Sequence, residues 1–568
     1  MSVLEETKSM LHAILVMARF FVRTSYRLVT TEASAGVIPV RTTSQRLVRS
    51  KPPASAKKTK QQDYYLLGIV LISLLVSVGS FAYYFNSDQI LVYKDAQSHL
   101  LIAKRVIDSP TPGLAQLGGV WPPLPHLLMQ PLIWNDYLYE TGIAGSIPSM
   151  LCFVGTSVFL YKITEVVSGS RWAGVVAGIV FISNPNVSYM QSTAMTELPL
   201  CMFLSGSVYF FIKWTQVIDQ PVGNITNGLA TTAMLICATL TRYEGWILLA
   251  LFVPLWGVVC INRHMPRERV EGEVFFLTFL ASLGIIGWLV WNYQIFDNPF
   301  YFQYGEYAKP SLWVGEAEQS VGNIWIAVKT YSIATYETAG IATLIFGLIG
   351  LAYFTVSDSK NIRKAPVYAL LFPFPFFVAA LYFGQRPLHV EQVSGDLYNV
   401  RFSLPMLLPL AIFTGYLTKN FVLSRVVIVS GVCVFSALII NQGHIITLNE
   451  PRADMDKALS ITQRDAAYWL SRNYDTGFVL MESYGNEELQ VVSKLPTDQI
   501  LYEGSYRMWE PALSDPVDFV DWIVMRSSGN ENDKVYEQLY GTSALNDHFL
   551  LVFSNEQIQI YRRITTPS

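Results

Sequence analysis

The chain has 568 residues, of which 51% are hydrophobic and only 15% are charged, and its formal net charge is −3. Soluble proteins carry roughly a quarter charged residues. This deficit, together with a mean hydropathy of +0.33, excludes an ordinary soluble protein and predicts one embedded in a lipid bilayer. The small net charge, with no basic run interleaved with aromatic residues, argues against a nucleic-acid partner.

The first part of the chain, residues 1–63, is rich in Lys, Arg, Ser, Thr and Pro. We predict a basic N-terminal segment on the cytosolic side of the membrane, because it has little apolar surface to bury. Within it the run MLHAILVMARFFVRTSYRLV is apolar but interrupted by Arg19, Arg23 and Arg27. This pattern favours an amphipathic helix at the membrane interface, with a targeting signal as the alternative.

Residues 64–443 are predicted to form a bundle of transmembrane helices. Apolar runs recur about eleven times, at 64–85, 146–161, 172–183, 198–212, 229–240, 246–261, 274–291, 339–354, 366–383, 402–417 and 426–440. From a cytosolic N-terminus, strict alternation places the Lys- and Arg-rich loops inside, in agreement with the positive-inside rule. We therefore expect a multi-pass protein of the cell membrane, or of the endoplasmic reticulum membrane in a eukaryote.

The cysteines and histidines give no sign of a metal site. All five cysteines lie inside apolar runs, an odd number without Cys-x-x-Cys spacing. This distribution is typical of packing residues. No His-Glu-x-x-His pattern is present either, so the sequence predicts no metal and no cofactor.

An odd number of spans leaves residues 444–568 on the outer side. This part is more polar and alternates short apolar runs with helical ones. GFVLMES, DWIVMRS and HFLLVFSNEQIQIYRR are predicted strands, the last a hairpin around Asn555, whereas DAAYWLSRNY and DKVYEQLYG are predicted helices. We expect a small α/β extracytoplasmic domain here. The fold class is therefore mainly α, a polytopic transmembrane bundle with a small C-terminal α/β domain.

The first outer loop, residues 86–145, is unusually long, and long loops in compact proteins are often functional. It contains YKDAQSHLLIAKR, in which Asp95 and His99 are spaced to share one face of a helix. Further on, Trp121 and several prolines suit a segment lying along the membrane interface. Asp95 therefore stands at the outer mouth of the bundle, unless it only caps the following helix.

The other outer loops bring carboxylates, arginines and aromatic hydroxyls to the same side of the membrane. A carboxylate can accept a proton from a substrate hydroxyl, and an arginine can bind a phosphate by two parallel hydrogen bonds. Each of these residues also has a purely structural alternative role, such as capping a helix, extending toward lipid headgroups or packing. The candidates for substrate binding are His99, Glu197, Arg242, Arg386, His389, Tyr398 and Arg401.

The order of these segments resembles the GT-C superfamily of polytopic glycosyltransferases, which take sugars from polyprenyl-phosphate donors. The resemblance rests on the Asp and His of the first outer loop, a PPL segment, TAMTELPL, TLTRYEGW and NVRFSLPMLLPL. It covers the plan of most of residues 64–568, although the matching stretches are short. The similar families are the protein O-mannosyltransferases, the aminoarabinose transferases of lipid A and, more distantly, oligosaccharyltransferase catalytic subunits.

By this resemblance Asp95 is the catalytic base, Glu197 is a second acid in the next outer loop, and Arg401 is a cation for the donor phosphate. The chain has Asp-Ala where protein O-mannosyltransferases have Asp-Glu, and the loop lacks an Asp-x-Asp. At these positions the resemblance supports neither a protein-mannosylating activity nor a metal requirement.

We therefore expect an inverting glycosyltransferase at the outer face, in which Asp95 deprotonates an acceptor hydroxyl. Its partners are a polyprenyl-phosphate sugar donor, a glycan, lipid or protein acceptor, and the bilayer. The rival hypothesis is a transporter or flippase, which would need more ionisable residues inside the spans and matched halves. A receptor or assembly protein with a ligand-binding outer domain is the third hypothesis.

Overall fold

The computed structural model describes residues 63–315, 318–357, 361–527 and 532–564. The predicted N-terminal basic segment, with its amphipathic helix or targeting signal, lies outside the described residues. The description therefore begins at Asp63, whose side chain caps α2 by accepting a hydrogen bond from the amide of Leu66.

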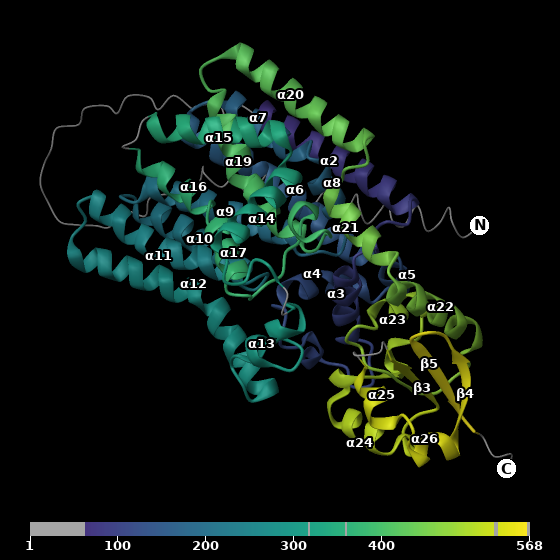
Figure 1. The fold of residues 1–568 in the computed structure, drawn as a ribbon. Helices are drawn as coiled ribbons and strands as arrows, with labels where there is room; N and C mark the ends of the chain where they lie inside the picture. The colour runs from purple at the N-terminus through teal and green to yellow at the C-terminus, as the bar shows by residue number, and fades with distance from the viewer. Residues whose placement is uncertain (1–62, 316–317, 358–360, 528–531, 565–568) are drawn as a thin grey trace, which may run out of the picture. The chain divides into compact units, whose positions relative to one another are not determined.

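The membrane part of the chain is a bundle of long helices (Figure 1). Its members are α2 (Tyr64–Asn86), α6 (Ile143–Ser168), α7 (Arg171–Ile182), α9 (Glu197–Val217), α10 (Pro221–Thr239), α11 (Glu244–Asn262), α12 (Arg267–Phe296), α14 (Ile324–Ala339), α15 (Ile341–Val356), α16 (Ala365–Ala369), α17 (Pro373–Tyr382), α19 (Leu407–Leu417) and α20 (Val422–Asn441). The 3₁₀ helices η4 (Ile362–Lys364) and η5 (Val400–Met406) precede α16 and α19.

All the predicted spans fall on helices. Among the described residues, eight helical segments are long and apolar enough to cross a membrane, or nine if α14 and α15, which meet at 110°, are one span. The two remaining predicted ranges coincide with α7, a shorter apolar helix, and α10. The chain is therefore a multi-pass membrane protein.

Burial separates the centre of the bundle from its periphery. In the segment of η5 and α19, 94% of the residues are buried, whereas only 11% are buried in the most apolar 18-residue stretch of the segment from Val422 to Met455. The exposed side chains on the outer helices are large and apolar, as Phe275 and Leu423 illustrate, because lipid rather than water surrounds them. In the centre, small residues allow backbones to meet: a Cβ at Gly350 would lie 2.2 Å from the carbonyl oxygen of Phe413.

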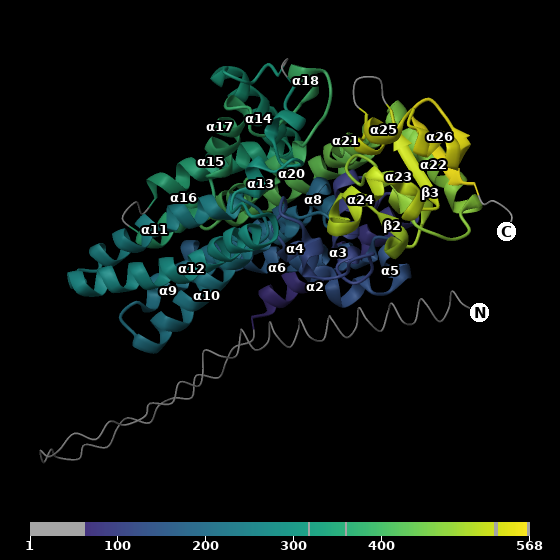
Figure 2. The same cartoon turned by 90° about the horizontal axis from the view of Figure 1, so that it is seen from below.

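The long connection between α2 and α6 is folded. It forms α3 (Lys94–Arg105), η2 (Leu114–Leu117), α4 (Leu124–Ile133) and α5 (Asp136–Glu140). In both views α3 lies between the bundle and the C-terminal part of the chain (Figure 1 and Figure 2). The segment that carries Asp95 and His99 is thus a largely buried helix and not a flexible loop.

The C-terminal part of the chain contains a five-stranded mixed sheet in the order β2-β1-β3-β5-β4. Its strands are β1 (Val479–Leu480), β2 (Ile500–Leu501), β3 (Trp522–Arg526), β4 (Phe549–Ser554) and β5 (Ile558–Arg563). β1 pairs in parallel with β2 and β3, and β5 pairs antiparallel with β3 and β4.

Helices cover both faces of this sheet. One apolar cluster joins α22 (Ala458–Asn473) and α23 (Glu487–Ser493) to Val524 and Ile560. The other joins α24 (Trp509–Ser514), α25 (Lys534–Leu539) and α26 (Ser543–His548) to Ile523 and Met525 on the opposite face. The predicted strands and helices of this domain are confirmed, and the two-residue edge strand β2 is an addition.

Candidate active site

Asp95 lies in the first turn of α3. The N-cap position belongs to Tyr93, which makes no side-chain cap, so Asp95 does not serve as the cap of this helix. Its Oδ2 atom instead contacts the guanidinium of Arg401. The side chain of Asp95 is 40% exposed and that of Arg401 only 6%. The acid is therefore accessible, while its partner is enclosed.

The position of Arg401 is fixed by the turn at the start of η5. Asn399 has a left-handed backbone (φ 55°), which Asn tolerates better than most residues. The amides of Asn399 and Val400 donate hydrogen bonds of 2.9 and 3.0 Å to the carboxylate of Glu450. The same carboxylate lies 3.0 Å from Nη1 of Arg401. Glu450, which lies on α21 (Ile446–Met455), thus holds both the backbone and the guanidinium.

A second arginine extends this network. Nη1 of Arg242, in the turn between α10 and α11, lies 2.9 Å from Oε1 of Glu197, and Nη2 lies 2.8 Å from Oε1 of Glu244. Glu197 is only 1% exposed, and its Oε1 is also 3.3 Å from Nε of Arg401. Buried charges are tolerated when they are paired. The site therefore contains a connected row of alternating carboxylates and guanidiniums.

The carboxylates also change the acidity of Arg242. Burial alone would lower its pKa, but the negative charges of Glu244 and Glu197 raise it above the ordinary value. Arg242 contacts two carboxylates and Arg401 contacts three. Both arginines are therefore largely neutralised by the protein itself.

Arg386 differs from these two arginines. It lines the same cavities, yet in the described part of the chain no carboxylate forms an ion pair or hydrogen bond with it. Burial lowers the pKa of Arg386 below its ordinary value, and the nearby negative charge of Glu244 offsets this only in part. Of the three arginines, Arg386 is the one whose charge is left for an anionic ligand.

His99 forms a buried pair with His126 from α4. Nδ1 of His99 lies 2.9 Å from Nε2 of His126, and the ring centroid of His99 lies 4.5 Å from that of Trp121. Burial, with the positive charges of Arg242 and Arg401, lowers the pKa of His99 to about 3, and burial lowers the pKa of His126 well below its usual range. Both rings are therefore neutral near pH 7.

Of the residues predicted to bind substrate, two line neither cavity: Glu197 and His389. His389 lies between Glu318, at 2.5 Å, and Asp396, at 2.9 Å. Burial would lower the pKa of His389, but the hydrogen bonds to these two carboxylates raise it. Tyr398, which pairs with His389 through the backbone, lines both cavities, and burial raises the pKa of its hydroxyl to about 12.

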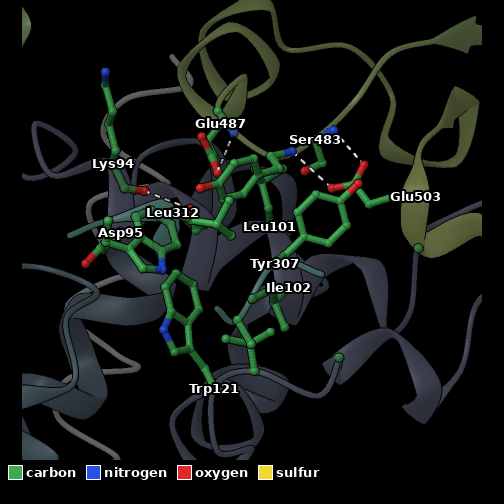
Figure 3. Close-up of a pocket in the computed structure, with 18 of the residues that line it drawn as sticks. Lys94, Asp95, Leu101, Ile102, Trp121, Tyr307, Leu312, Ser483, Glu487 and Glu503 are labelled. Atoms are coloured by element: carbon green, nitrogen blue, oxygen red, sulfur yellow. Dashed lines mark hydrogen bonds between the residues drawn. The ribbon is translucent and has the colours of Figure 1, made fainter. Parts of the chain in front are cut away.

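Two adjoining cavities meet at Asp95. The smaller, of about 130 Å³, also contains His99, Arg242 and Glu244. The larger, of about 560 Å³, extends from Asp95 to the C-terminal domain, and a cavity of this size suits a ligand. Figure 3 shows Asp95 on one side of the larger cavity, Glu487 and Glu503 on the side of the C-terminal domain, and Trp121 and Tyr307 along its wall.

Two members of the site have no clear sequence signal. Glu450 lies beyond the last predicted span, at the start of the region expected to be the outer domain, and only its nearness to the end of that span could mark it. His126 stands in an apolar, proline-rich run that is typical of an interfacial helix. Within the described residues, no group of three or more His, Cys, Asp or Glu side chains could hold a metal ion.

Residues 70–300 match the family model described as dolichyl-phosphate-mannose-protein mannosyltransferase. No curated protein sequence matches the chain significantly. The crystal structure of ArnT from Cupriavidus metallidurans bound to undecaprenyl phosphate is similar with a TM-score of 0.57 at 11% identity, over 89% of this chain and 99% of that chain. Its apo state gives the same values.

The apo oligosaccharyltransferase of Archaeoglobus fulgidus gives a TM-score of 0.48 at 10% identity, over 82% of this chain and 70% of that chain. The family match and the ArnT likeness agree with the sequence resemblance, which is confirmed: the chain has the polytopic fold of the GT-C glycosyltransferases.

Proposed function

We propose that the protein is a membrane glycosyltransferase that moves a sugar from a polyprenyl-phosphate donor to an acceptor hydroxyl. The observation that carries the proposal is the position of Asp95, an accessible carboxylate where two cavities meet, held by an enclosed arginine. The family match over residues 70–300 and the undecaprenyl phosphate in the ArnT structure support the choice of donor. In this proposal the site faces outward and the N-terminus is cytosolic.

Asp95 is the general base. Its Oδ2 is engaged by Arg401, whereas its Oδ1 has no hydrogen-bond partner among the described residues. An acceptor hydroxyl that donates to Oδ1 loses its proton there as its oxygen attacks the anomeric carbon. The bond from that carbon to the phosphate oxygen breaks on the opposite side, so the configuration inverts and polyprenyl phosphate leaves.

The leaving phosphate needs a cation. Arg401 is surrounded by three carboxylates, so an additional anion would compete with groups that are already bound. We therefore assign the phosphate first to Arg386, which lines both cavities without a carboxylate partner of its own among the described residues. Arg401 and Arg242 then act mainly by orienting Asp95 and by their positive field.

The remaining candidates orient these groups or the substrate. Glu197 bridges Arg401 and Arg242 and is a positioning residue in this proposal. His99 shares the smaller cavity with Asp95, and its bond to His126 fixes the ring so that a neutral imidazole faces the substrate. The hydroxyl of Tyr398 remains protonated and can donate a hydrogen bond. Trp121 marks the side from which the prenyl chain enters.

The test uses purified protein in lipid nanodiscs and a panel of radiolabelled polyprenyl-phosphate sugars. At least one donor should release its sugar to water or to an added acceptor. Asp95→Asn should lower this rate by about 10²–10⁴-fold, as expected for loss of a general base, while donor binding persists. Asp88→Asn, at an exposed position, is the matched control. A rate near wild type in Asp95→Asn would contradict the assignment of the base, and uptake of a donor without cleavage would favour a transporter.

A further inference from the structure

The wall of the larger cavity opposite Asp95 is built by the C-terminal domain. Ser483, Tyr484 and Gly485 come from the loop after β1, Glu487 begins α23, and Glu503 lies in η7 (Glu503–Met508). None of these groups takes part in the network around Arg401. This wall is therefore available for a second ligand beside the donor.

Two carboxylates of this wall form no ion pair in the described part of the chain, although the positive charge of Arg105 acts on Glu503 and that of Lys94 on Glu487. Glu503 accepts hydrogen bonds from the amides of Ser483 and Tyr484 at 2.7 and 3.0 Å, and Glu487 accepts one from Gly485 at 3.3 Å. Burial raises the pKa of Glu503 to about 7 and also raises that of Glu487. Each carboxylate oxygen has two lone pairs, so both groups can accept further hydrogen bonds from the cavity.

The neighbouring acid Glu482 is an example of a carboxylate in which both oxygens accept hydrogen bonds from the protein. Oε1 of Glu482 accepts a hydrogen bond of 2.9 Å from the hydroxyl of Tyr307, and Oε2 accepts one of 2.9 Å from the amide of Lys534. Both oxygens of Glu482 are thus used inside the protein. Glu503 likewise receives one amide on each oxygen, whereas Glu487 receives an amide on Oε1 alone. Of the three acids, Glu487 therefore has the most capacity left for a ligand.

The wall also presents aromatic rings. The ring of Tyr484 lies 5.1 Å from that of Tyr307 and 5.4 Å from that of Trp313. All three line the cavity, and the side chain of Tyr307 points toward its centre in Figure 3. Tyr and Trp offer an apolar face beside a polar edge. That combination suits a ligand with both C–H and O–H surface.

The cations near this wall are mostly occupied. Lys94 and Lys457 both pair with Asp454, at 3.1 and 3.0 Å. Arg105 donates to Ser483 at 2.7 Å and to Gln490 at 2.5 Å, and its guanidinium lies 3.7 Å from the ring centroid of Tyr502. The wall therefore offers mainly hydrogen-bond acceptors and rings, so it favours a ligand rich in neutral donors over an anionic one.

We propose that this wall is the acceptor subsite and that it takes a carbohydrate. Sugar hydroxyls donate to Glu487 and Glu503, and the C–H face of the ring lies against Tyr307 and Trp313. The hydroxyl that reacts points to Oδ1 of Asp95, which takes its proton as the acceptor oxygen bonds to the anomeric carbon and polyprenyl phosphate departs. This inference rests on the proposed function and specifies its acceptor as a glycan.

A peptide acceptor fits this wall less well. Extended peptides are commonly held by pairing with the edge of a sheet. The edge strand nearest the wall, β2, is only two residues long, and both Ile500 and Leu501 are buried. The other edge strand, β4, lines neither cavity. Within the described part of the chain, no sheet edge is therefore offered to a peptide at this position.

Binding of the acceptor can be measured without turnover. Full-length protein in nanodiscs with undecaprenyl phosphate is titrated with four trisaccharides, namely α-1,6-mannotriose, maltotriose, cellotriose and β-1,4-galactotriose, by saturation-transfer NMR and tryptophan fluorescence. At least one should bind. Glu487→Gln, Glu503→Gln and Trp313→Ala should each weaken that binding by about tenfold or more, while Trp313→Phe retains most of it.

Glu510→Gln, at an exposed acid of the same domain, is the control, and thermal unfolding of each variant shows whether it is folded. Failure of all four trisaccharides to bind would overturn the inference. So would equal binding in folded Glu487→Gln and Glu503→Gln variants, or binding of a Ser/Thr hexapeptide or of a hydroxylated lipid that depends on Glu487.

The two proposals fail in different ways. Trisaccharide binding at this wall, with no sugar released from any polyprenyl-phosphate donor, would keep the subsite and overturn the glycosyltransferase. Donor cleavage that depends on Asp95, with no trisaccharide bound, would keep the enzyme and overturn the glycan acceptor.

Discussion

The two sides of the cavity next to Asp95 differ in how their charges are satisfied. On the membrane side, Arg401 and Arg242 are saturated by four carboxylates of the chain itself. On the side of the C-terminal domain, Glu487 and Glu503 receive only backbone amides in the described structure. The first arrangement fixes reactive groups in place, whereas the second leaves hydrogen-bonding capacity for a ligand. Substitutions should therefore affect the two sides differently.

The largest effect is expected where one residue serves two buried arginines. Glu197→Ala removes the carboxylate shared by Arg242 and Arg401 and leaves both partly uncompensated. Loss of one partner of a buried ion pair costs about 3–5 kcal/mol, so thermal unfolding should shift strongly downward and sugar transfer should disappear. Glu268→Gln, at an exposed acid of α12, is the control. Unchanged stability in Glu197→Ala would show that the network is not structurally important.

The Arg386→Ala variant tests the arginine that, of Arg242, Arg386 and Arg401, forms no ion pair with a carboxylate among the described residues. Arg386→Ala should weaken binding of the polyprenyl-phosphate donor by about 10–100-fold, since hydrogen bonds to charged groups contribute about 1.5–3 kcal/mol. Affinity for the acceptor should hardly change. Arg267→Ala, at a guanidinium that is 88% exposed, serves as the comparison, and titration with labelled donor gives both affinities. If donor affinity fell more in Arg401→Lys than in Arg386→Ala, Arg401 rather than Arg386 would be the residue that binds the donor phosphate.

The C-terminal domain should respond to pH. Burial raises the pKa values of Glu503 and Asp533 to about 7 in the folded protein, whereas unfolded carboxyl groups titrate near pH 4. The folded state thus binds more protons between about pH 4 and 7, and its extra stability is lost as the pH rises through 7.

We expect the free energy of unfolding to fall by up to about 5 kcal/mol between pH 5 and 8, because each of the two groups contributes about 1.4 kcal/mol per pH unit up to its pKa. Calorimetry of Glu503→Gln with Asp533→Asn should give a flatter pH profile than wild type. A stability that instead increases over this range would contradict the raised pKa values of these two carboxyl groups.

The smallest effect is expected at the histidine pair. The His126→Leu substitution fills the same buried position in α4 with an apolar side chain, but it removes the hydrogen-bond partner of His99. The buried Nδ1 of His99 then lacks a partner, which costs about 1–3 kcal/mol, and transfer should slow by only a few-fold. His126→Asn should restore part of the rate, because the amide can again bond to His99. A loss of activity as large as that of Asp95→Asn would mean that His126 has a direct role.

The sequence predicts the helices of this fold well because lipid imposes long apolar runs, which are easy to detect. The ranges predicted for the spans all fall on helices, and the hairpin around Asn555 is present as β4 and β5. The edge strand β2 is missed because two residues carry no periodicity. The N-cap alternative for Asp95 could be decided only from the geometry of α3.

The site is predicted in part for a related reason. Topology alone brings Asp95, Glu197, Arg242 and Arg401 to one end of the bundle, and they do meet there. Topology cannot tell which arginine is neutralised, since that depends on distances between turns far apart in the chain. It also cannot separate His389, which binds Glu318 and Asp396, from residues that reach the cavities.

The helix α3 links the helix bundle to the C-terminal domain. Asp95 lies at one end, and Arg105, clamped by Ser483 and Gln490, lies at the other. The ten residue steps from Asp95 to Arg105 span about 15 Å of helix. We expect a rotation of the C-terminal domain that displaces Ser483 to shift the carboxylate of Asp95 relative to Arg401. Seating of a ligand at the distal end of the helix would be transmitted mechanically to the reacting atoms.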